Sequence, residues 1–91
     1  MGVNLSYNQA KNESNILLRG LDFNLVKDFN WFLATIYEDT RKNYGENRFV
    51  AIGSIDERIY VVIFTPRRNK IHVISLRKAN KREVKKYEEK N

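Results

Sequence analysis

Four apolar segments of strand length follow one another along most of the chain, and this repetition restricts the fold more than any other feature. They are rich in β-branched and aromatic residues, and polar stretches of turn length separate them. The segments cover residues 33–39, 48–53, 59–65 and 70–76. Because segments joined by such short connections pair as antiparallel hairpins, the sequence predicts an antiparallel sheet.

The connections between the later segments carry turn signals. Ser54 to Arg58 is a short loop between two runs that are rich in β-branched residues. Pro66-Arg67-Arg68-Asn69 is expected to be a turn with proline at its second position. Arg67 is therefore expected in a hairpin turn.

The N-terminal part is expected to form a short strand and a helix. Residues 3–7 are the strand, and Asn8 can cap a helix that runs to about Leu18. Gly20 then ends the helix, because glycine adopts the left-handed conformation that other residues avoid. The apolar residues near one face of this helix are Ala10, Ile16 and Leu17.

A second helix is expected to begin at Asp22. Its carboxylate can accept hydrogen bonds from the first turn, and Leu21 and Val26 occupy the positions of a hydrophobic staple. The expected buried stripe consists of Leu25, Val26, Phe29, Phe32 and Leu33.

A final helix is expected after the last strand. Asn80 is the N-cap, and Glu83 completes an asparagine version of the capping box. Only Val84 and Tyr87 are apolar beyond this point, so the helix can bury only a narrow stripe. Weak anchoring of this kind makes the helix a candidate for meeting a partner.

These elements predict an α+β fold. Two N-terminal helices and a C-terminal helix surround a four- to five-stranded antiparallel sheet, in a single domain of residues 1–91. Cysteine is absent, which excludes disulfides and thiolate metal sites and favours a reducing compartment. Apolar runs such as residues 60–64 are far shorter than the roughly 20 residues that span a bilayer, and no signal peptide follows Met1. We therefore expect a soluble, cytoplasmic protein.

The formal net charge of +6 is unevenly distributed. Residues 1–65 hold 7 basic and 8 acidic side chains, a net charge of −1, whereas residues 66–91 hold 10 basic and 3 acidic, a net charge of +7. A positive field of this kind attracts polyanions, so nucleic acid is the leading partner class. A solvated basic helix would give the same composition, and charge alone does not separate the two interpretations.

Short motifs follow one another along nearly the whole chain. The first group is Tyr7, Asn8, Lys11, Asn15, Arg19-Gly20 and Phe23. The second group is Glu38-Asp39-Thr40-Arg41, Tyr44-Gly45-Glu46, Arg48 and Ala51-Ile52-Gly53. The third group is Val61-Val62, Thr65-Pro66-Arg67, Ile74-Ser75-Leu76-Arg77-Lys78-Ala79, Arg82-Glu83 and Tyr87. In order and spacing these motifs resemble the BrnT family of toxins, whose fold resembles that of RelE-type ribonucleases.

The resemblance implies a bacterial endoribonuclease that acts as the toxin of a type II toxin-antitoxin pair. It also implies a hetero-oligomer with a cognate, BrnA-like antitoxin that has a DNA-binding domain and a segment covering the active face. The chain departs from the family at two positions. Arg19 stands where the family usually has histidine, and Asn8 where it usually has an acid. A histidine acid or base is therefore absent from that position.

The expected chemistry needs neither a metal nor a cofactor. RNA can be cut when its own 2′-OH attacks the adjacent phosphorus, provided that the enzyme neutralises the charge that develops on the phosphate. Arginine suits this task because its planar fork donates two parallel hydrogen bonds and stays protonated. The candidate catalytic residues are Arg48, Arg67, Arg77 and Glu83.

These candidates differ in position. Each of the three arginines matches a family arginine, but the expected hairpins rank Arg77 and Arg48 above Arg67, which need not lie close to Arg77. The alternative role of each arginine is an exposed charge or an ion pair with Glu38, Asp39 or Glu46. Glu83 could act as a base, although stabilisation of the helix N-terminus already explains why a glutamate stands at this position.

Further basic and aromatic residues are candidates for holding RNA. Lys11, Arg19, Lys78 and Arg82 are expected to bind the phosphate backbone. Tyr44 and Tyr87 could stack on bases, but core packing is the favoured role of Tyr87. His72, the single histidine, lies within an expected strand and is interpreted as structural or solvent-facing. The alternative functions are a non-catalytic RNA-binding module that has lost activity and a protein-interaction module whose basic helix binds an acidic peptide.

Overall fold

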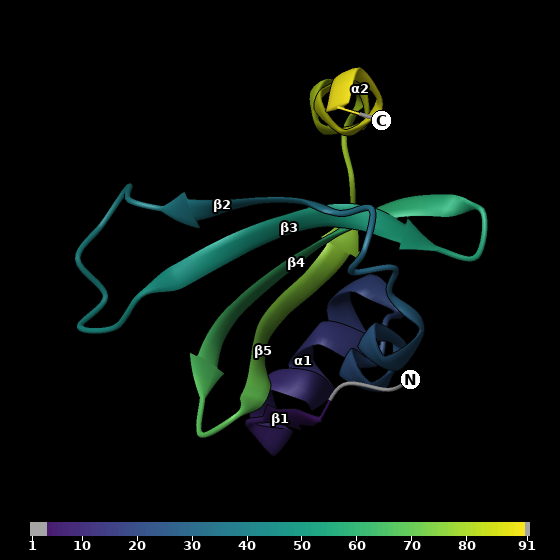
Figure 1. The fold of residues 1–91 in the computed structure, drawn as a ribbon. Coiled ribbons are helices and arrows are strands. Elements are labelled where there is room, and N and C mark those ends of the chain that lie inside the picture. The colour runs from purple at the N-terminus through teal and green to yellow at the C-terminus, as the bar shows by residue number, and fades with distance from the viewer. Residues whose placement is uncertain (1–3, 91) are drawn as a thin grey trace.

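The computed structural model describes residues 4–90 and contains a five-stranded sheet between helical elements. Figure 1 shows these elements in chain order. They are β1 (Leu5–Tyr7), α1 (Gln9–Arg19), the 3₁₀ helix η1 (Phe23–Asp28), β2 (Thr35–Asp39), β3 (Arg48–Ile55), β4 (Arg58–Arg67), β5 (Lys70–Lys78) and α2 (Lys81–Lys90). The α+β fold is thus as the sequence predicted. The expected first strand begins at Val3, which lies outside the described residues.

The sheet is mixed and not purely antiparallel. Its strand order is β1-β5-β4-β3-β2, and strands β2 to β5 pair in antiparallel fashion as expected. β1 instead pairs with β5 in parallel, with Leu5 beside Ile71 and Tyr7 beside Val73. No hairpin connects these two strands, so turn signals do not determine their direction. The expectation of an all-antiparallel sheet is therefore wrong at this one edge.

The connections from β3 to β5 are tighter than expected. β3 and β4 are joined by the turn at Asp56 and Glu57. β4 continues through Pro66 and Arg67, and the turn consists of Arg68 and Asn69, with φ values of 46° and 65°. Two left-handed residues match the twist of a hairpin, which explains why the turn forms there and not at the proline. Arg67 therefore belongs to a strand.

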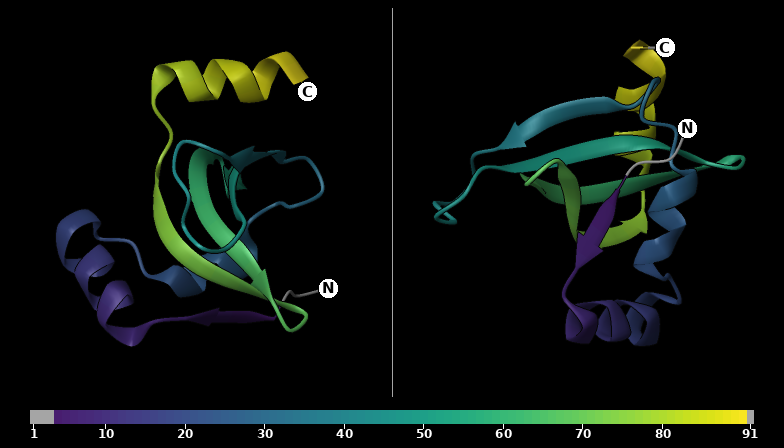
Figure 2. Two further views of the ribbon diagram at one scale, coloured as in Figure 1. Left: turned by 90° about the vertical axis from the view of Figure 1, so that its left-hand side faces the viewer. Right: turned by 60° about the horizontal axis from the view of Figure 1, so that its bottom comes forward.

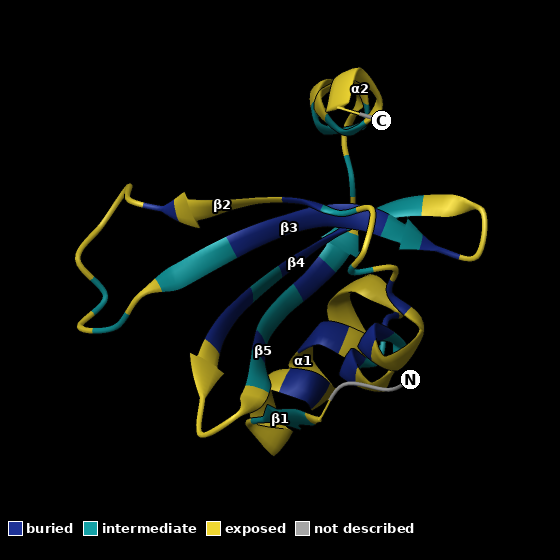
Figure 3. Cartoon of the chain, viewed as in Figure 1, coloured by how far each residue is buried: buried dark blue, intermediate teal, exposed yellow. Residues whose placement is uncertain are grey.

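α1 and η1 cover one face of the sheet, and the main core lies beneath them (Figures 2 and 3). Its buried members are Leu21, Phe23, Val26, Phe29, Ala51, Ile55, Val62, Phe64, Val73 and Leu76. Gly53 of β3 permits this packing, because a Cβ there would lie 2.7 Å from the ring of Phe29. Burying a side chain such as Phe23 stabilises the fold by about 1.5–3 kcal/mol.

The buried side of α1 is polar, which the sequence pattern did not predict. Asn12 and Asn15 are buried, whereas Leu17 is 86% exposed. Ala10 and Ile16 are exposed as well, so the prediction that these residues form a buried apolar face of the helix is wrong. The two asparagines satisfy buried backbone groups: Asn12 accepts from the Phe23 N–H, and Asn15 donates to the Leu21 and Leu76 carbonyls. The predicted caps at Asn8 and Gly20 are confirmed.

The second expected helix is a short 3₁₀ helix. Asp22 caps it as predicted, accepting from the Asn24 N–H at 2.8 Å, but η1 ends at Asp28. The chain then turns, so the expected stripe does not continue, and Phe32 is 95% exposed. The structure therefore has one N-terminal α-helix within residues 4–90, and not two.

α2 lies on the opposite face of the sheet, beyond a short extended link (Figure 1). Val50, Ile52 and Val61 form a second, smaller buried cluster there, against which Tyr87 packs. The packing role favoured for Tyr87 is thus confirmed. No residue of α2 is itself fully buried. This face of the sheet is consequently only partly covered.

Candidate functional site

A cleft of about 310 Å³ opens between the end of β2 and the start of α2. Its lining residues are Tyr37, Glu38, Asp39, Thr40, Arg41, Val50, Ile63, Arg77 and Glu83. Val50 and Ile63 come from the central strands β3 and β4, and they give the cleft apolar surface. Charged groups beside such surface interact more strongly than in open water, because less solvent screens them.

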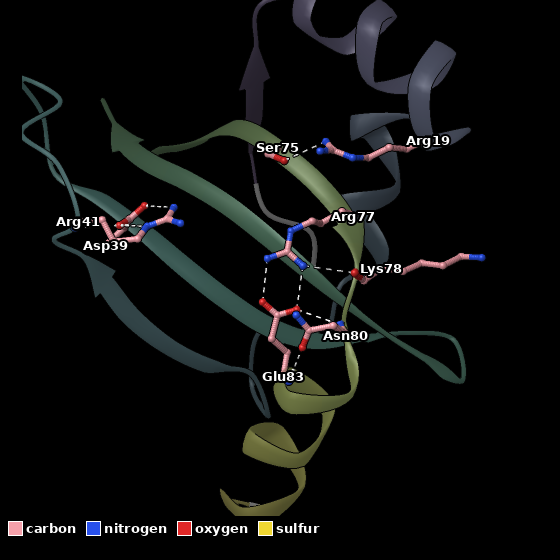
Figure 4. A network of polar contacts seen from close by, with 8 residues as sticks. All are labelled: Arg19, Asp39, Arg41, Ser75, Arg77, Lys78, Asn80 and Glu83. Atoms are coloured by element: carbon pink, nitrogen blue, oxygen red, sulfur yellow. Dashed lines mark hydrogen bonds and ion pairs between the residues drawn. The ribbon is translucent and has the colours of Figure 1, made fainter.

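Arg77 and Glu83 form one wall of the cleft. The two guanidinium nitrogens Nη1 and Nη2 of Arg77 donate to the Glu83 carboxylate at 2.8 and 2.7 Å (Figure 4). Both side chains are partly buried, with exposed fractions of 33% and 15%. The hydrogen bond from Arg77 lowers the pKa of Glu83, and the same bond raises the pKa of Arg77. Glu83 is therefore an anion that orients Arg77.

The predicted capping box at the start of α2 is confirmed. The Glu83 N–H donates to the side chain of Asn80 at 2.8 Å, and the Asn80 N–H donates to Glu83 Oε1 at 2.9 Å. Glu83 Oε1 thus accepts from both the helix N-terminus and Arg77. This double role fixes the carboxylate with respect to the sheet and the helix together.

Asp39 and Arg41 form the wall opposite Arg77. The side chain of Arg41 donates to the Asp39 carboxylate through Nε and Nη2, both at 2.9 Å, and the backbone N–H of Arg41 donates to the same carboxylate at 3.2 Å. The Tyr44 hydroxyl adds a fourth bond at 3.1 Å. The hydrogen bond from the Arg41 side chain holds the pKa of Asp39 far below its ordinary value, even though the carboxylate is buried. The candidate site residues named from the sequence did not include Asp39 and Arg41, although both belong to one of the motifs that resemble the family.

Arg48 and Arg67 share a different carboxylate, that of Glu46. Arg67 Nη2 lies 2.8 Å from it, and Arg48 Nε lies 3.7 Å away. The Arg48 guanidinium also stacks on the Tyr44 ring at 4.0 Å. Because Arg48 is the register partner of Asp39, it lies beside the cleft, whereas Arg67 lies at the opposite end of the β4–β5 hairpin from Arg77. Arg77 and Glu83 thus share the cleft, and Arg67 lies apart from it.

Of the residues expected to bind RNA, Arg19 makes the clearest contact with the sheet. From the last turn of α1, its Nη1 donates to Asn15 at 2.8 Å. The same nitrogen reaches Ser75 of β5 at 3.3 Å, as Figure 4 shows. Lys11 and Arg19 line a hollow of about 230 Å³ at the edge of β5. Lys78 and Arg82 are exposed beside the Arg77 wall.

His72 is half-buried within β5, and its Nδ1 lies 2.9 Å from the Ser6 hydroxyl of β1. Burial lowers the pKa of His72, and the nearby positive charge of Arg67 lowers it further. These contacts support the interpretation of His72 as a structural residue that joins β1 to β5. Within residues 4–90, no three His, Asp or Glu side chains are grouped so that they could hold a metal ion. None of the helices in the described residues is both long and apolar enough to span a membrane.

Known proteins share both the sequence pattern and the fold. Residues 7–83 match the model of the family described as "Ribonuclease toxin, BrnT, of type II toxin-antitoxin system". The chain is also similar to the crystal structure of the ribonuclease toxin BrnT from Brucella abortus, with 28% sequence identity and a TM-score of 0.68. The similarity covers 87% of this chain and 99% of the Brucella chain. No curated protein sequence matches.

Proposed function

The chain belongs to the BrnT family of ribonuclease toxins of type II toxin-antitoxin systems, and from this premise we propose that it cleaves RNA without a metal ion at the cleft between β2 and α2. One observation carries the proposal. Arg77 is partly buried in a cleft with a partly apolar lining, and a fixed carboxylate orients its guanidinium group. Such an arrangement stabilises a phosphate dianion without reorganisation at the moment of reaction.

The reaction is a transesterification within the RNA. The 2′-oxygen forms a bond to phosphorus while the bond to the 5′-oxygen breaks, which leaves a cyclic phosphate and a 5′-hydroxyl. The 2′-hydroxyl loses a proton, and the 5′-oxygen gains one. Arg77 neutralises the charge on the phosphate oxygens between these two events, and one well-aimed donor is worth about 3–4 kcal/mol of transition-state stabilisation.

Glu83 acts on Arg77 more readily than on the proton of the 2′-hydroxyl. A general base is most effective when its pKa lies near the working pH, but the hydrogen bond from Arg77 lowers the pKa of Glu83. In this proposal Glu83 orients the arginine. Its assignment as the base remains a sequence-based prediction, which the pH dependence of cleavage tests.

The remaining basic residues hold the RNA on either side of the cleft. Arg48 lies beside Asp39, and Arg67 lies next to the β4–β5 turn, so that both arginines are near Glu46. The backbone contacts are assigned to Lys11, Arg19, Lys78 and Arg82. Such contacts position RNA without reading its sequence and weaken as salt rises.

The antitoxin is the second partner in this proposal. A BrnA-like protein would cover the cleft and form a hetero-oligomer with the toxin in the cytoplasm. The basic C-terminal third supports an acidic or amphipathic covering segment, because charge complementarity steers association. The likeness to RelE-type ribonucleases belongs to the same proposal.

The decisive experiment incubates the purified chain with labelled RNA, with and without EDTA, beside Arg77→Ala and Arg58→Ala. Arg58 is exposed and lies outside the cleft, so its variant controls for the loss of one positive charge. We expect cleavage that survives EDTA, is lost in Arg77→Ala and persists in Arg58→Ala. Full activity of a folded Arg77→Ala would contradict the assignment.

A non-catalytic RNA-binding module is the second candidate. Arg19, at the position where the family usually has histidine, is already bonded to Asn15 and Ser75, which supports a binding role. This candidate expects salt-dependent RNA binding without cleavage in the same assay. A pure protein-interaction module would not bind RNA even at low salt.

A further inference from the structure

Two guanidinium groups face the same cleft from opposite walls, although the resemblance and the charge pattern pointed to only one of them. Arg77 comes from β5, and Arg41 follows the end of β2 (Figure 4). Each is held by its own carboxylate, Arg77 by Glu83 and Arg41 by Asp39. The two carboxylates therefore fix two like charges on either side of one open space.

Both arginines keep donors for a ligand. Arg41 bonds Asp39 through Nε and Nη2, so its Nη1 makes no hydrogen bond within residues 4–90. Arg77 bonds Glu83 through Nη1 and Nη2, which leaves its Nε–H without a partner in the same described region. The Arg41 side chain is 75% exposed and therefore accessible from solvent. The cleft thus offers unused N–H groups from two sides.

Asp39 holds Arg41 in place, together with Tyr44. Its side chain is only 3% exposed, and its two oxygens accept four hydrogen bonds from Arg41 and Tyr44. A carboxylate satisfied in this way and kept ionised has no capacity left to move a proton or accept from a substrate. A buried charge is costly unless it is fully paired, so its presence here fixes the orientation of Arg41.

We propose that Arg41 and Arg77 bind one phosphate group between them, with Arg41 as the second guanidinium at the reacting phosphodiester and Asp39 as its positioning residue. The proposal rests on the proposed ribonuclease function and names where the scissile phosphate lies. An anion between the two arginines relieves their mutual repulsion, which already opposes the effect of Glu83 on the pKa of Arg77. Phosphate oxygens accept the planar, paired donors that arginine presents.

Phosphate binding is measured independently of cleavage. Inorganic phosphate, and a dinucleotide with a 2′-deoxy group at the scissile position, are titrated into the protein while backbone amide signals are followed by NMR. The wild type is compared with Arg41→Gln and with Arg58→Gln, which removes the same charge away from the cleft. We expect shifts at the ends of β2 and β5, an affinity at least ~10-fold weaker in Arg41→Gln, and no change in Arg58→Gln.

Cleavage provides the second measurement. Removing one such donor lowers kcat by about 10²–10³-fold, so we expect a loss of this size in Arg41→Gln. Arg41→Lys should rescue little, because a single ammonium group cannot pair side-on with Asp39 and still present a fork. Asp39→Asn should lower kcat more than it raises KM, because it misorients Arg41 and leaves the arginine present.

The outcomes separate the two proposals. RNA cleavage with unchanged phosphate affinity and unchanged kcat in Arg41→Gln would overturn the anion site and leave the ribonuclease function standing. Phosphate binding that requires Arg41, in a wild-type chain that cleaves no RNA, would support the anion site and refute the ribonuclease function. Amide shifts confined to the β4–β5 turn would also overturn the assignment.

Discussion

The two faces of the sheet are held in different ways. The face under α1 and η1 is closed by a large apolar core, and the asparagines of α1 bond the backbone beneath them. The face under α2 has a small apolar cluster with ion pairs at its rim, of which Arg77–Glu83 connects β5 to α2. Apolar burial and satisfied amides provide stability, whereas oriented charges beside an open cleft provide binding. The molecule separates these two tasks between its two faces.

The largest effect on stability is expected from the α1 side. Phe23→Ala removes a ring that is 1% exposed and packs edge-on against Tyr7. We expect the free energy of unfolding to fall by about 3–5 kcal/mol, because a cavity remains in the core. Urea unfolding measures the change, and Phe32→Ala is the matched control because Phe32 is 95% exposed. If Phe23→Ala and Phe32→Ala lowered the free energy of unfolding equally, the prediction that the buried ring stabilises the fold more than the exposed ring would be contradicted.

A smaller loss is expected from Asn15→Ala. The variant removes the donor that serves the Leu21 and Leu76 carbonyls, and both groups become unsatisfied. We expect a loss of about 1–3 kcal/mol in urea unfolding. Asn24→Ala, at an exposed position of η1, serves as the control and should lie within about 0.5 kcal/mol of the wild type. If Asn15→Ala unfolds at the same urea concentration as the wild type, water has replaced the amide as the donor to the two carbonyls, which would contradict the expected loss.

Acid should loosen the α2 side before the α1 side. Hydrogen bonds from arginine lower the pKa values of Asp39 and Glu83 in the folded chain. Their contribution to stability is complete above the ordinary carboxyl pKa of about 4, and it is lost as pH falls through the lower folded values. We therefore expect amide signals of α2 to lose dispersion below about pH 4, while those of α1 remain. Asp39→Asn combined with Glu83→Gln should abolish this pH dependence.

The smallest effect on stability is expected from Glu83→Gln. Glutamine can still cap the helix, and a partly exposed ion pair contributes only about 0–1 kcal/mol. Cleavage should nevertheless fall by roughly 10-fold or more at every pH, because Arg77 loses its orienting anion. A loss seen only above the pKa of a carboxyl group would instead indicate that Glu83 is the base. Glu89→Gln, exposed on the same helix, is the control.

Local signals in the sequence were reliable because local physics determines them. Asn8, Gly20, Asp22 and the Asn80–Glu83 box form the caps that they predict, since each needs only neighbouring N–H groups or a left-handed φ. The four antiparallel strands follow equally well from their short connections. These elements depend on contacts within a few residues or across one turn.

Other features depend on contacts between distant segments and could not be predicted. The parallel pairing of β1 with β5 joins residues more than sixty positions apart, as the Ser6–His72 bond illustrates. Asn15 is buried because the Leu76 carbonyl lies opposite, which no helical periodicity reveals. Arg41 belongs to a motif of the resemblance but was not among the candidate site residues, because nothing in its spacing along the sequence links it to Arg77. Only the fold places that pair opposite Arg77.

The amide of Asn15 also has a consequence for the solubility of the sheet. β1 pairs with only the first part of β5, from Ile71 to Val73, and the strand continues to Lys78. Along that continuation, the Leu76 carbonyl accepts from Asn15, and Arg19 lies against Ser75. Exposed strand edges invite pairing with other chains, and an edge capped by side chains from a helix does not. Asn15 thus occupies one edge carbonyl of β5 and Arg19 lies beside it, which leaves less of this border open to pairing with another chain.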